Sequence, residues 1–525
     1  AHEPRHPAVP MSQAPTVAPK QPTPPDFGYD ALVTTHNYTY ERTCKASIVS
    51  RLPWLVGTFI IPSASQFEMG GFSMQSIGDG FGKLSRFTLA GSKSTSLCYS
   101  GRMMATGWWN ESISLGRVGP GALFLETVPP RNYTIAENMK GAGDNVFVNT
   151  YQLGGEFFAV TDAPKELNFD PLSLHVTGTV SWSDHLGFGN IALGSAHPLP
   201  EVVASATSGC LIDILPQQTL LGAEITVYRT CPQEPTHREA LARYPTFDCL
   251  RYSHSFGLSE RHAVLPMMHF CLDMLSVLTA GGSLSHAFKP VEQNESTKVV
   301  LLPLHGIGPR TFEVPGNVYF THVVHTLENA SAVVMDIVTF DSNPFTGEVA
   351  LLAALRNRSV RDANQQRGTI ARWVMHIDGP RKGLLDARNL SVAGRHTDFP
   401  KINHRYRGKP YCLYWAVEWF HDDVHFGSMA IVRQDVCTGR RTYWHRLAAF
   451  PSEPTFVPRP EGSAEDDGVI LFTLLDGVHG KSRLMAVDAS SMETVSEWPT
   501  EMTIGFTTHG EWYESLVDAS PHPTL

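Results

Sequence analysis

The chain has 525 residues, of which 42% are hydrophobic and only 18% are charged, so it can bury a sizeable core in one large domain or several smaller ones. Its 41 basic and 51 acidic residues give a formal net charge of −10. No basic stripe is present to neutralise phosphates, which argues against a nucleic-acid partner. The eight cysteines are scattered and form no Cys-x-x-Cys pair, which argues against zinc ribbons and leaves room for one or two disulfides.

The first part of the chain differs in composition from the rest. Residues 1–27 are rich in Pro, Ala, Thr and Gln and show almost no apolar periodicity, which predicts a disordered N-terminal tail. Residues 28–525 contain no Gly/Ser-rich linker, and we expect them to form a single domain. The most apolar stretch, residues 263–280, contains His269 and Asp273 and is too polar to predict a membrane-spanning helix.

Short apolar runs recur from this point to the C-terminus. Residues 54–62 predict a strand that ends at Pro62, and residues 145–151 and 157–160 predict a hairpin that turns at Gly154 and Gly155. Further strands are expected over residues 333–340, 411–417 and 469–475. Together with 43 glycines and 37 prolines, this pattern favours an all-β fold of many short strands. A β-propeller is the closed all-β form that suits this length, because its radial blades protect the sheet edges.

Four histidines stand in distinctive local sequences. They are His197 in Gly-Ser-Ala-His-Pro, His254 in Tyr-Ser-His-Ser-Phe-Gly, His322 in Phe-Thr-His-Val-Val and His509 in Gly-Phe-Thr-Thr-His-Gly. No two of them are close enough in sequence to share a helix, so they can meet only in a fold that directs several strand ends at one point. A propeller axis does this. Four neutral imidazoles without a carboxylate or thiolate suit Fe(II) with room left for dioxygen.

These four segments resemble those of the carotenoid cleavage oxygenase family, which also contains retinoid isomerohydrolases and stilbene-cleaving oxygenases. Further segments agree with the family pattern: Asp-Phe-Pro-Lys-Ile-Asn at 398–403, Pro-Ser-Glu-Pro-Thr-Phe-Val at 451–457, Glu-Asp-Asp-Gly at 465–468 and Gly-Asp-Gly at 78–80. The resemblance extends over about residues 48–515. It implies a seven-bladed β-propeller with a cap of helices and loops over the iron-bearing face.

The resemblance also implies the site residues. The iron ligands correspond to His197, His254, His322 and His509. His322 is preferred over His325 because the family's ligand lies six residues before a glutamate. The three carboxylates that hydrogen-bond to ligand imidazoles correspond to Asp162, Asp398 and Glu453, where the family has three glutamates. The two aspartates are one methylene shorter, so either the backbone moves inward or a water bridges the gap. His269, His325 and His421 are expected to have structural roles only.

The activity implied by the resemblance is oxidative cleavage of a conjugated C=C bond with O2, which gives two carbonyl products. The family's stilbene cleavers carry a lysine at the position of Thr161, so carotenoid, apocarotenoid or retinoid substrates are favoured here. Two alternatives stay open. One is an isomerase or isomerohydrolase that uses the same iron as a Lewis acid. The other is a catalytically weak carotenoid-binding propeller. The natural substrate and the cleavage position cannot be read from the sequence.

A second sequence pattern indicates the cellular compartment of the protein. Seven asparagines lie in Asn-x-Ser/Thr sequons, which favours the secretory route and a glycoprotein, with a plastid or cytoplasmic membrane-associated protein as the alternative. A carotenoid substrate also implies peripheral membrane association through an apolar patch, for which residues 267–278 are a candidate.

Overall fold

The computed structural model describes residues 25–45, 52–90, 96–140, 143–187, 191–203, 206–273, 284–291, 296–306, 308–345, 350–364, 367–392 and 394–516. The first 24 residues of the predicted tail lie outside these ranges, and Pro25–Val33 forms the 3-10 helix η1. None of the helices in the described ranges is long and apolar enough to cross a membrane.

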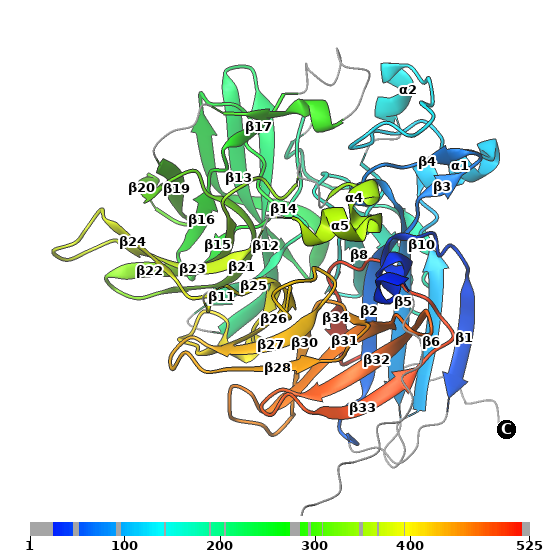
Figure 1. Cartoon of the computed structure of the whole chain (residues 1–525). Helices are drawn as coiled ribbons and strands as arrows, with labels where there is room; N and C mark the ends of the chain where they lie inside the picture. Colours follow the sequence, from blue (N-terminus) through cyan, green and yellow to red (C-terminus); the bar gives the residue numbers. More distant parts are fainter. Residues whose placement is uncertain are drawn as a thin grey trace, which may run out of the picture.

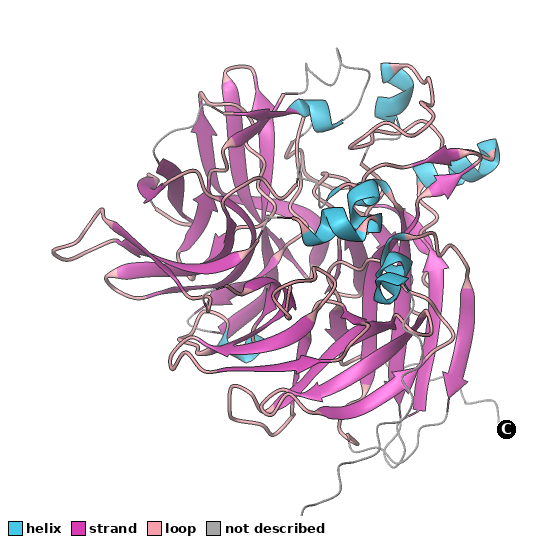
Figure 2. Cartoon of the chain, in the orientation of Figure 1, coloured by secondary structure: helices cyan, strands magenta, loops and turns pink. Residues whose placement is uncertain are grey.

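Seven antiparallel sheets of four or five strands make up the body of the molecule, and Figure 1 shows them arranged around a common centre. Strands dominate and helices are few (Figure 2). In blade 1 the order is β1 (Tyr40–Lys45), β6 (Ser96–Met103), β5 (Phe81–Ala90) and β2 (Gly57–Gln66). The C-terminal strand β34 (Glu511–Tyr513) pairs with β2 and so closes the ring between the two ends of the chain. The predicted seven-bladed propeller is confirmed.

The other six blades follow in chain order, each starting with its innermost strand. Blade 2 contains β7 (Asn149–Leu153), β8 (Glu156–Val160), β9 (Leu167–Phe169) and β10 (Val176–Thr179). Blade 3 contains β11 (Leu199–Val203), β12 (Ala206–Thr219), β13 (Gly222–Cys231) and β14 (Glu234–Thr246). Blade 4 contains β15 (Gly257–Leu258), β16 (His262–Pro266), β19 (Ser296–Pro303) and β20 (Arg310–Pro315).

Blade 5 contains β21 (Tyr319–Glu328), β22 (Ala332–Phe340), β23 (Thr369–His376) and β24 (Leu385–Asn389). Blade 6 contains β25 (His396–Lys401), β26 (Leu413–Trp419), β27 (Ala430–Asp435) and β28 (Arg441–His445), with the short helix η5 (His404–Tyr406) after β25. Blade 7 contains β31 (Gly468–Asp476), β32 (Lys481–Asp488) and β33 (Thr494–Pro499), and its inner position is shared by β29 (Ala449–Pro451) and β30 (Thr455–Pro458).

Long connections between the blades form the predicted cap on one face, where Figure 1 shows α1, α2, α4 and α5. These connections bond to one another: Ser73 N donates to Val128 O, Leu284 N to Leu123 O, and Leu352 N to Gln75 O. The cap elements are β3 (Glu68–Met69), β4 (Phe72–Ser73), η2 (Ile77–Asp79), α1 (Gly107–Leu115), α2 (Ile135–Lys140), β17 (Phe270–Leu272), η3 (Leu284–Ala287), β18 (Phe288–Pro290), α4 (Leu352–Arg356) and α5 (Arg358–Asp362).

The strands predicted from apolar runs are present, with shifted ends. The hairpin of β7 and β8 turns at Gly154 and Gly155, as expected. The prediction that the first strand ends at Pro62 is wrong, because β2 continues to Gln66. The carbonyl of Pro62 accepts a hydrogen bond from Thr508 N, so this residue turns its backbone polar groups away from β5. The ladder with β5 therefore needs no N–H from the proline.

Residues 263–280, considered above as a membrane segment and an apolar patch, do not form a continuous element. They contribute to β16 and β17, and residues 274–280 lie outside the described residues. Met267 and Met268 are 5% and 0% exposed, so the described part of the candidate patch is core rather than surface.

Glu328, at the end of β21, joins blades 4 and 5. Its carboxylate accepts hydrogen bonds from Ser259 Oγ and Arg261 Nε, both at 2.7 Å, and lies 3.1 Å from His262 Nδ1. Burial alone would raise the pKa of Glu328, but the bonds from His262 and Ser259 and the charge of Arg261 lower it to about 2. Because this folded-state pKa lies below the ordinary value of 4.5, the carboxylate stabilises the fold above pH 4.5, and this contribution is lost as the pH falls toward 2.

Replacing Glu328 by glutamine is expected to lower the free energy of unfolding by about 2 kcal/mol at pH 7, allowing for the exposure of Arg261. Urea unfolding of both proteins at pH 7 and pH 3.5 measures this. The difference between them should shrink at the lower pH, and an equal difference at both pH values would contradict the role of the ionised carboxylate.

Candidate metal centre

The four predicted histidines lie at the starts of inner strands of four different blades. His197 and His509 come two residues before β11 and β34, His254 comes three residues before β15, and His322 lies in β21. His254, His322 and His509 are buried and His197 is half-buried. Residues up to 312 positions apart in the chain therefore meet at the propeller axis.

The imidazoles present their Nε2 atoms to one another. The distance from His197 Nε2 to His509 Nε2 is 2.9 Å, and His322 Nε2 lies 3.2 Å from the Nε2 atoms of both His254 and His509. All four ligand atoms lie within 4.8 Å of one another. Neighbouring nitrogens bound to one ion at 2.0–2.1 Å would be roughly 3 Å apart, so this spacing suits four ligands of a single metal ion.

The opposite nitrogen of each ring faces an acceptor. His254 Nδ1 lies 2.8 Å from Asp162 Oδ2, His322 Nδ1 lies 2.7 Å from Asp398 Oδ1, and His509 Nδ1 lies 2.9 Å from Glu453 Oε1. His197 Nδ1 lies 3.0 Å from the backbone carbonyl of His254. Since carboxylates and carbonyls accept hydrogen bonds, these partners place the proton of each neutral ring on Nδ1 and leave a lone pair on Nε2.

Four lone pairs thus converge at 2.9–3.2 Å with no donor between them. Protonation of a ring would relieve this repulsion, but burial and the neighbouring imidazoles hold the pKa of His197 and of His509 well below the usual range, with Lys401 adding to the effect. A cation is the species that such a set of neutral donors accommodates, and imidazole is a ligand that suits iron. The residues present therefore fit the metal that the sequence implies.

The three carboxylates come from the three blades that supply no histidine. Asp162 follows β8 in blade 2, Asp398 lies in β25 of blade 6, and Glu453 lies between β29 and β30 in blade 7. Both aspartates touch their imidazoles directly, which answers the question raised by their shorter side chains: no water is needed. At Asp398 the backbone departs from regular strand geometry, because the β25–β26 register shifts after this residue and Phe399 has a positive φ of 55°.

The residues around the histidines explain why their local sequences are distinctive. Ser255 Oγ donates to Thr321 O and accepts from Val323 N, so the segment of His254 holds the strand on both sides of His322. A Cβ on Gly194 would lie 2.5 Å from Ala163 O, and one on Gly510 would lie 2.4 Å from the ring of Phe59. Glycine at these two positions lets the chain approach closely enough to aim His197 and His509 at the axis.

Several polar residues of the site were not predicted from the sequence. Tyr252 OH donates to Asp162, Thr321 Oγ1 donates to Asp398 Oδ2 at 2.9 Å, and Lys401 Nζ lies 3.4 Å from Glu453 Oε2. Burial raises the pKa of Glu453 to about 7, and Lys401 opposes this increase. All three residues lie inside or beside motifs quoted above, so their position in the motifs was the available signal.

Two phenylalanines supply apolar surface beside the histidines. The ring centroid of Phe345 is 5.4 Å from that of His254, and Phe399 is 5.0 Å from His322 and 5.4 Å from His509. Neither was singled out in the sequence, where they are two of 27 phenylalanines.

The histidines expected to be structural have partners elsewhere. His325 Nε2 lies 3.0 Å from Lys409 O, His269 Nε2 lies 2.9 Å from Thr297 Oγ1, and His421 Nδ1 lies 2.7 Å from Glu418 Oε1. None of these three belongs to the four-histidine cluster.

Comparison with known proteins agrees with this geometry. The family model described as "Retinal pigment epithelial membrane protein" (RPE65) matches residues 39–514, which is most of the chain. The chain belongs to the RPE65/carotenoid oxygenase family. This confirms the family predicted from the sequence motifs and the expectation of an oxygenase-type enzyme.

Relatives in this family are distant in sequence. The chain is 22% identical to the carotenoid isomerooxygenase of Galleria mellonella over 83% of this chain and 86% of that protein. It is 24% identical to the chloroplastic carotenoid cleavage dioxygenase 8 homolog A of Oryza sativa subsp. japonica, with 88% and 83% covered. It is 21% identical to the β,β-carotene 15,15′-dioxygenase of Rattus norvegicus, with 89% and 88% covered.

Solved structures show the same fold. The cobalt-substituted apocarotenoid oxygenase of Synechocystis superposes with a TM-score of 0.78 at 19% identity, covering 94% of this chain and all of that one. A mutant of the same oxygenase gives a TM-score of 0.79 at 19% identity, with the same coverage.

Proposed function

We propose that this chain is a non-haem Fe(II) dioxygenase that cleaves a conjugated C=C bond of a carotenoid or apocarotenoid and releases two carbonyl products. The observation that supports this most directly is the convergence of four neutral imidazoles, without a carboxylate, at the propeller axis. Fe(II) held by His197, His254, His322 and His509 would supply the binding and activation of O2.

The chain's own residues prepare this site. Asp162, Asp398 and Glu453 hold a proton on Nδ1 of three of the imidazoles, which keeps each Nε2 available as a donor atom. The second contacts of the two aspartates, from Tyr252 and Thr321, stop the carboxylates from rotating away. No charged ligand compensates the metal, and this favours the ferrous state.

The substrate class is proposed from the apolar surroundings and from one substitution. Phe345 and Phe399 present aromatic faces beside the histidines, which suits a conjugated hydrocarbon and excludes water from the reacting bond. Thr161 stands where stilbene cleavers of this family have a phenol-binding lysine, so a polyene is favoured over a phenolic stilbene.

The proposal is tested with protein purified anaerobically, loaded with Fe(II), and exposed to β-carotene and to apocarotenals in detergent under ¹⁸O2. We expect O2 consumption and two carbonyl products whose masses add up to the substrate plus two oxygen atoms. Isomerised or hydrolysed polyene without O2 uptake would contradict the proposal and identify the chain as an isomerase or isomerohydrolase. Bound, unchanged polyene with no iron would replace it by a carrier.

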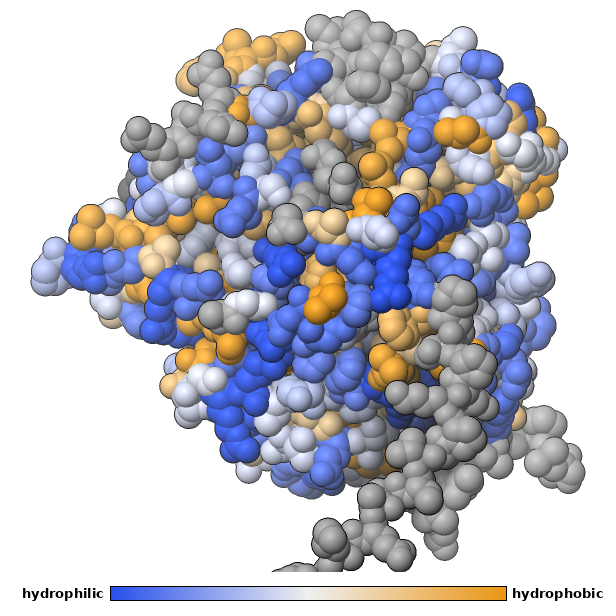
Figure 3. All heavy atoms as spheres, in the orientation of Figure 1, coloured by the Kyte–Doolittle hydropathy of each residue, from blue (hydrophilic) through white to orange (hydrophobic). Residues whose placement is uncertain are grey.

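A membrane surface is proposed as the source of the substrate. Leu220, Leu221 and Phe247 are 103%, 76% and 90% exposed, and they follow the adjacent ends of β12 and β14. Leu199, at the start of β11, pairs with Ile212 of β12, and β12 continues beyond this pair to Thr219. The β12–β13 turn therefore projects from the same end of blade 3 as His197, which precedes β11. Figure 3 shows hydrophobic residues gathered at this edge, above the β12–β13 hairpin. We call these three residues the apolar tip.

Replacing all three residues of the apolar tip by aspartate is expected to reduce binding to phosphatidylcholine vesicles at least about tenfold, because each large apolar side chain contributes roughly 1.5–3 kcal/mol when fully buried. Vesicle flotation measures this. The matched control is Val203→Asp, which places a charge on an exposed side chain at the opposite end of the same blade. Equal loss of binding in both variants would reject the apolar tip as the docking surface.

A further inference from the structure

The sequon asparagines share a structural property that the other asparagines lack. Six of the seven lie within the described residues, and all six are exposed: Asn37, Asn110, Asn132, Asn329, Asn357 and Asn389. Eight other asparagines are described, and every one of them is buried or half-buried: Asn138, Asn145, Asn149, Asn168, Asn317, Asn343, Asn364 and Asn403. Exposure therefore follows the Asn-x-Ser/Thr pattern and not the residue type.

The exposed sequons lie in connecting segments, in or beside helices, and at strand ends. Asn37 lies between η1 and β1, Asn110 is in α1 and Asn132 precedes α2. Asn329 lies in the β21–β22 turn, Asn357 between α4 and α5, and Asn389 at the end of β24. None of these positions touches the four histidines, so a large substituent fits without disturbing the metal centre.

Local hydrogen bonds direct the side-chain nitrogen outward at three of the sites. In Asn329, Asn357 and Asn389 the Oδ1 atom accepts from the backbone N–H of the serine two residues later, at 2.8, 3.1 and 2.7 Å. No hydrogen bond in the described part of the chain uses Nδ2 of these three side chains. Asn110 Nδ2 donates to Ala105 O at 3.0 Å, and a substituted amide keeps one N–H for this bond.

The cysteines independently indicate the secretory route that the sequons favour. All eight cysteines are paired: Cys44 with Cys98, Cys210 with Cys231, Cys249 with Cys271, and Cys412 with Cys437. The first pair joins directly opposed positions of β1 and β6, and the second joins the neighbouring strands β12 and β13. Four disulfides in one chain are typical of oxidising compartments and rare in the cytosol. The expectation of one or two was too low.

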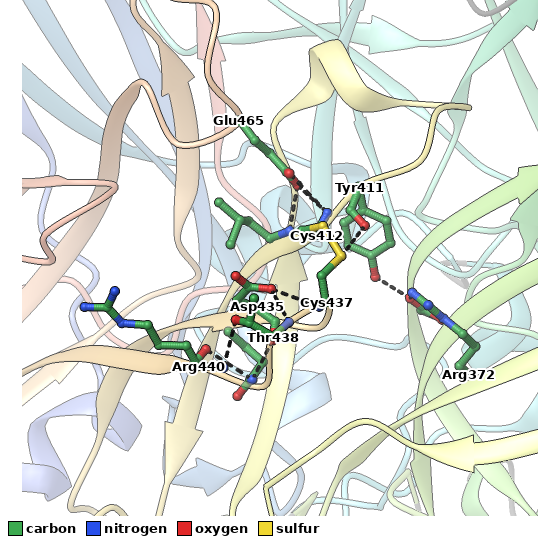
Figure 4. The surroundings of a disulfide bond; sticks show 11 residues. Arg372, Tyr411, Cys412, Asp435, Cys437, Thr438, Arg440 and Glu465 are labelled. Carbon is green, nitrogen blue, oxygen red and sulfur yellow. Dashed lines mark hydrogen bonds and ion pairs between the residues drawn. A yellow bond between two sulfur atoms is a disulfide. The ribbon is translucent and has the colours of Figure 1, made fainter.

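The Cys412–Cys437 pair shows that these cysteines are placed as disulfides rather than as metal ligands (Figure 4). The nearby carboxylate of Asp435 accepts from the backbone N–H of Cys437 and of Thr438, both at 2.9 Å. Glu465 accepts from Cys412 N at 2.9 Å and from Leu413 N at 2.6 Å. Both carboxylates are thus used to hold the two chain segments that the disulfide joins.

We propose that the protein is N-glycosylated at Asn37, Asn110, Asn132, Asn329, Asn357 and Asn389 during passage through an oxidising secretory compartment. At each site Nδ2 bonds to C1 of the first sugar of a lipid-linked oligosaccharide pyrophosphate, the lipid pyrophosphate leaves, and the amide loses one proton. Each disulfide forms by the loss of two protons and two electrons from two thiols to a disulfide donor of that compartment. The proposal does not depend on the activity proposed above.

The positions are compatible with contact between the apolar tip and a membrane. Blade 3 contains no sequon between residues 199 and 246, so its tip stays free of glycan. Asn110 lies one turn from the exposed Ile113 on α1, and a glycan there would keep that part of the cap in water.

The test uses the endogenous full-length protein, captured from its own source and digested with a peptide N-glycosidase in H2¹⁸O. We expect a loss of mass, and labelled conversion of asparagine to aspartate at the six positions. Alkylation before reduction should modify no cysteine, and alkylation after reduction should modify eight. An unchanged mass, or free thiols at all eight cysteines, would overturn the proposal.

Variants made in secretory cells locate the individual sites. Ser331→Ala keeps Asn329 but destroys its sequon, and it should remove the mass of one glycan. Asn343→Gln, at a half-buried asparagine outside any sequon, should leave the glycan mass unchanged. Loss of a glycan in the second variant and not in the first would contradict the assignment of Asn329, independently of iron content or turnover.

Discussion

Replacing His322 by alanine is expected to lower the iron content of the anaerobically purified enzyme to less than about a tenth and to reduce turnover by more than about 100-fold. The Nε2 atom of His322 lies 3.2 Å from two other Nε2 atoms, and its Nδ1 is held by Asp398. Its removal leaves three imidazoles and a buried carboxylate that has lost its imidazole partner. Loss of a hydrogen-bond partner of a metal ligand costs about 10–100-fold in metal affinity or activity, so loss of the ligand itself should cost more.

His325 provides a matched control in the same strand. It is also buried, but it lies on the other side of β21, where its Nε2 bonds to the carbonyl of Lys409. His325→Ala should lower the free energy of unfolding while keeping the iron content near the wild-type value. Iron quantitation together with thermal unfolding separates the two effects. Equal loss of iron in both variants would show that misfolding, and not the removal of a ligand, explains the result.

The architecture and the identity of the histidines were accessible from the sequence because the local sequences of the four histidines resemble those of a known family, and each of these local sequences has a structural cause. Gly194 and Gly510 permit close approach of the backbone, and Ser255 holds the neighbouring blade. These requirements are local, so they leave a trace in the sequence within a few residues of the ligand. The four-histidine cluster was therefore predicted as a set, and the structure brings that set together.

The breaks in strand pairing that position the site could not be predicted in this way. The β21–β22 register shifts around His322, the β25–β26 register shifts after Asp398, and the inner strand of blade 7 stops at Pro451 and resumes at Thr455, on either side of Glu453. Each break depends on a partner strand far along the chain. Apolar periodicity reports burial and not register, so it missed these features and the exact strand ends.

The pairing of the cysteines was inaccessible for the same reason. Cys44 and Cys98 face each other only because β1 pairs with β6 across 54 residues. Scattered spacing, which argued correctly against a zinc ribbon, carries no information about which strands become neighbours.

Replacing Asp398 by alanine is the second large effect that we expect, with a loss of about 10–100-fold in affinity for Fe(II). The carboxylate bonds to His322 Nδ1 at 2.7 Å and to Thr321 Oγ1 at 2.9 Å, so the substitution removes the acceptor that fixes the tautomer of the imidazole. A Nδ1–H without a partner in a buried site favours rotation of the ring or transfer of the proton to Nε2. Either change removes a donor atom from the metal, and competition with a chelator measures the affinity.

Two further substitutions distinguish orientation of the ligand from general stability. Asp386, on the outer strand β24, lies 2.9 Å from His376 Nε2, so Asp386→Ala also removes a carboxylate from an imidazole and should leave iron affinity unchanged. Asp398→Glu keeps the acceptor but adds a methylene to a contact that is already direct, so it should lose less affinity than Asp398→Ala. If Asp398→Ala binds iron as tightly as the wild type while Asp386→Ala does not, the carboxylates at the axis cannot be what orients the histidines.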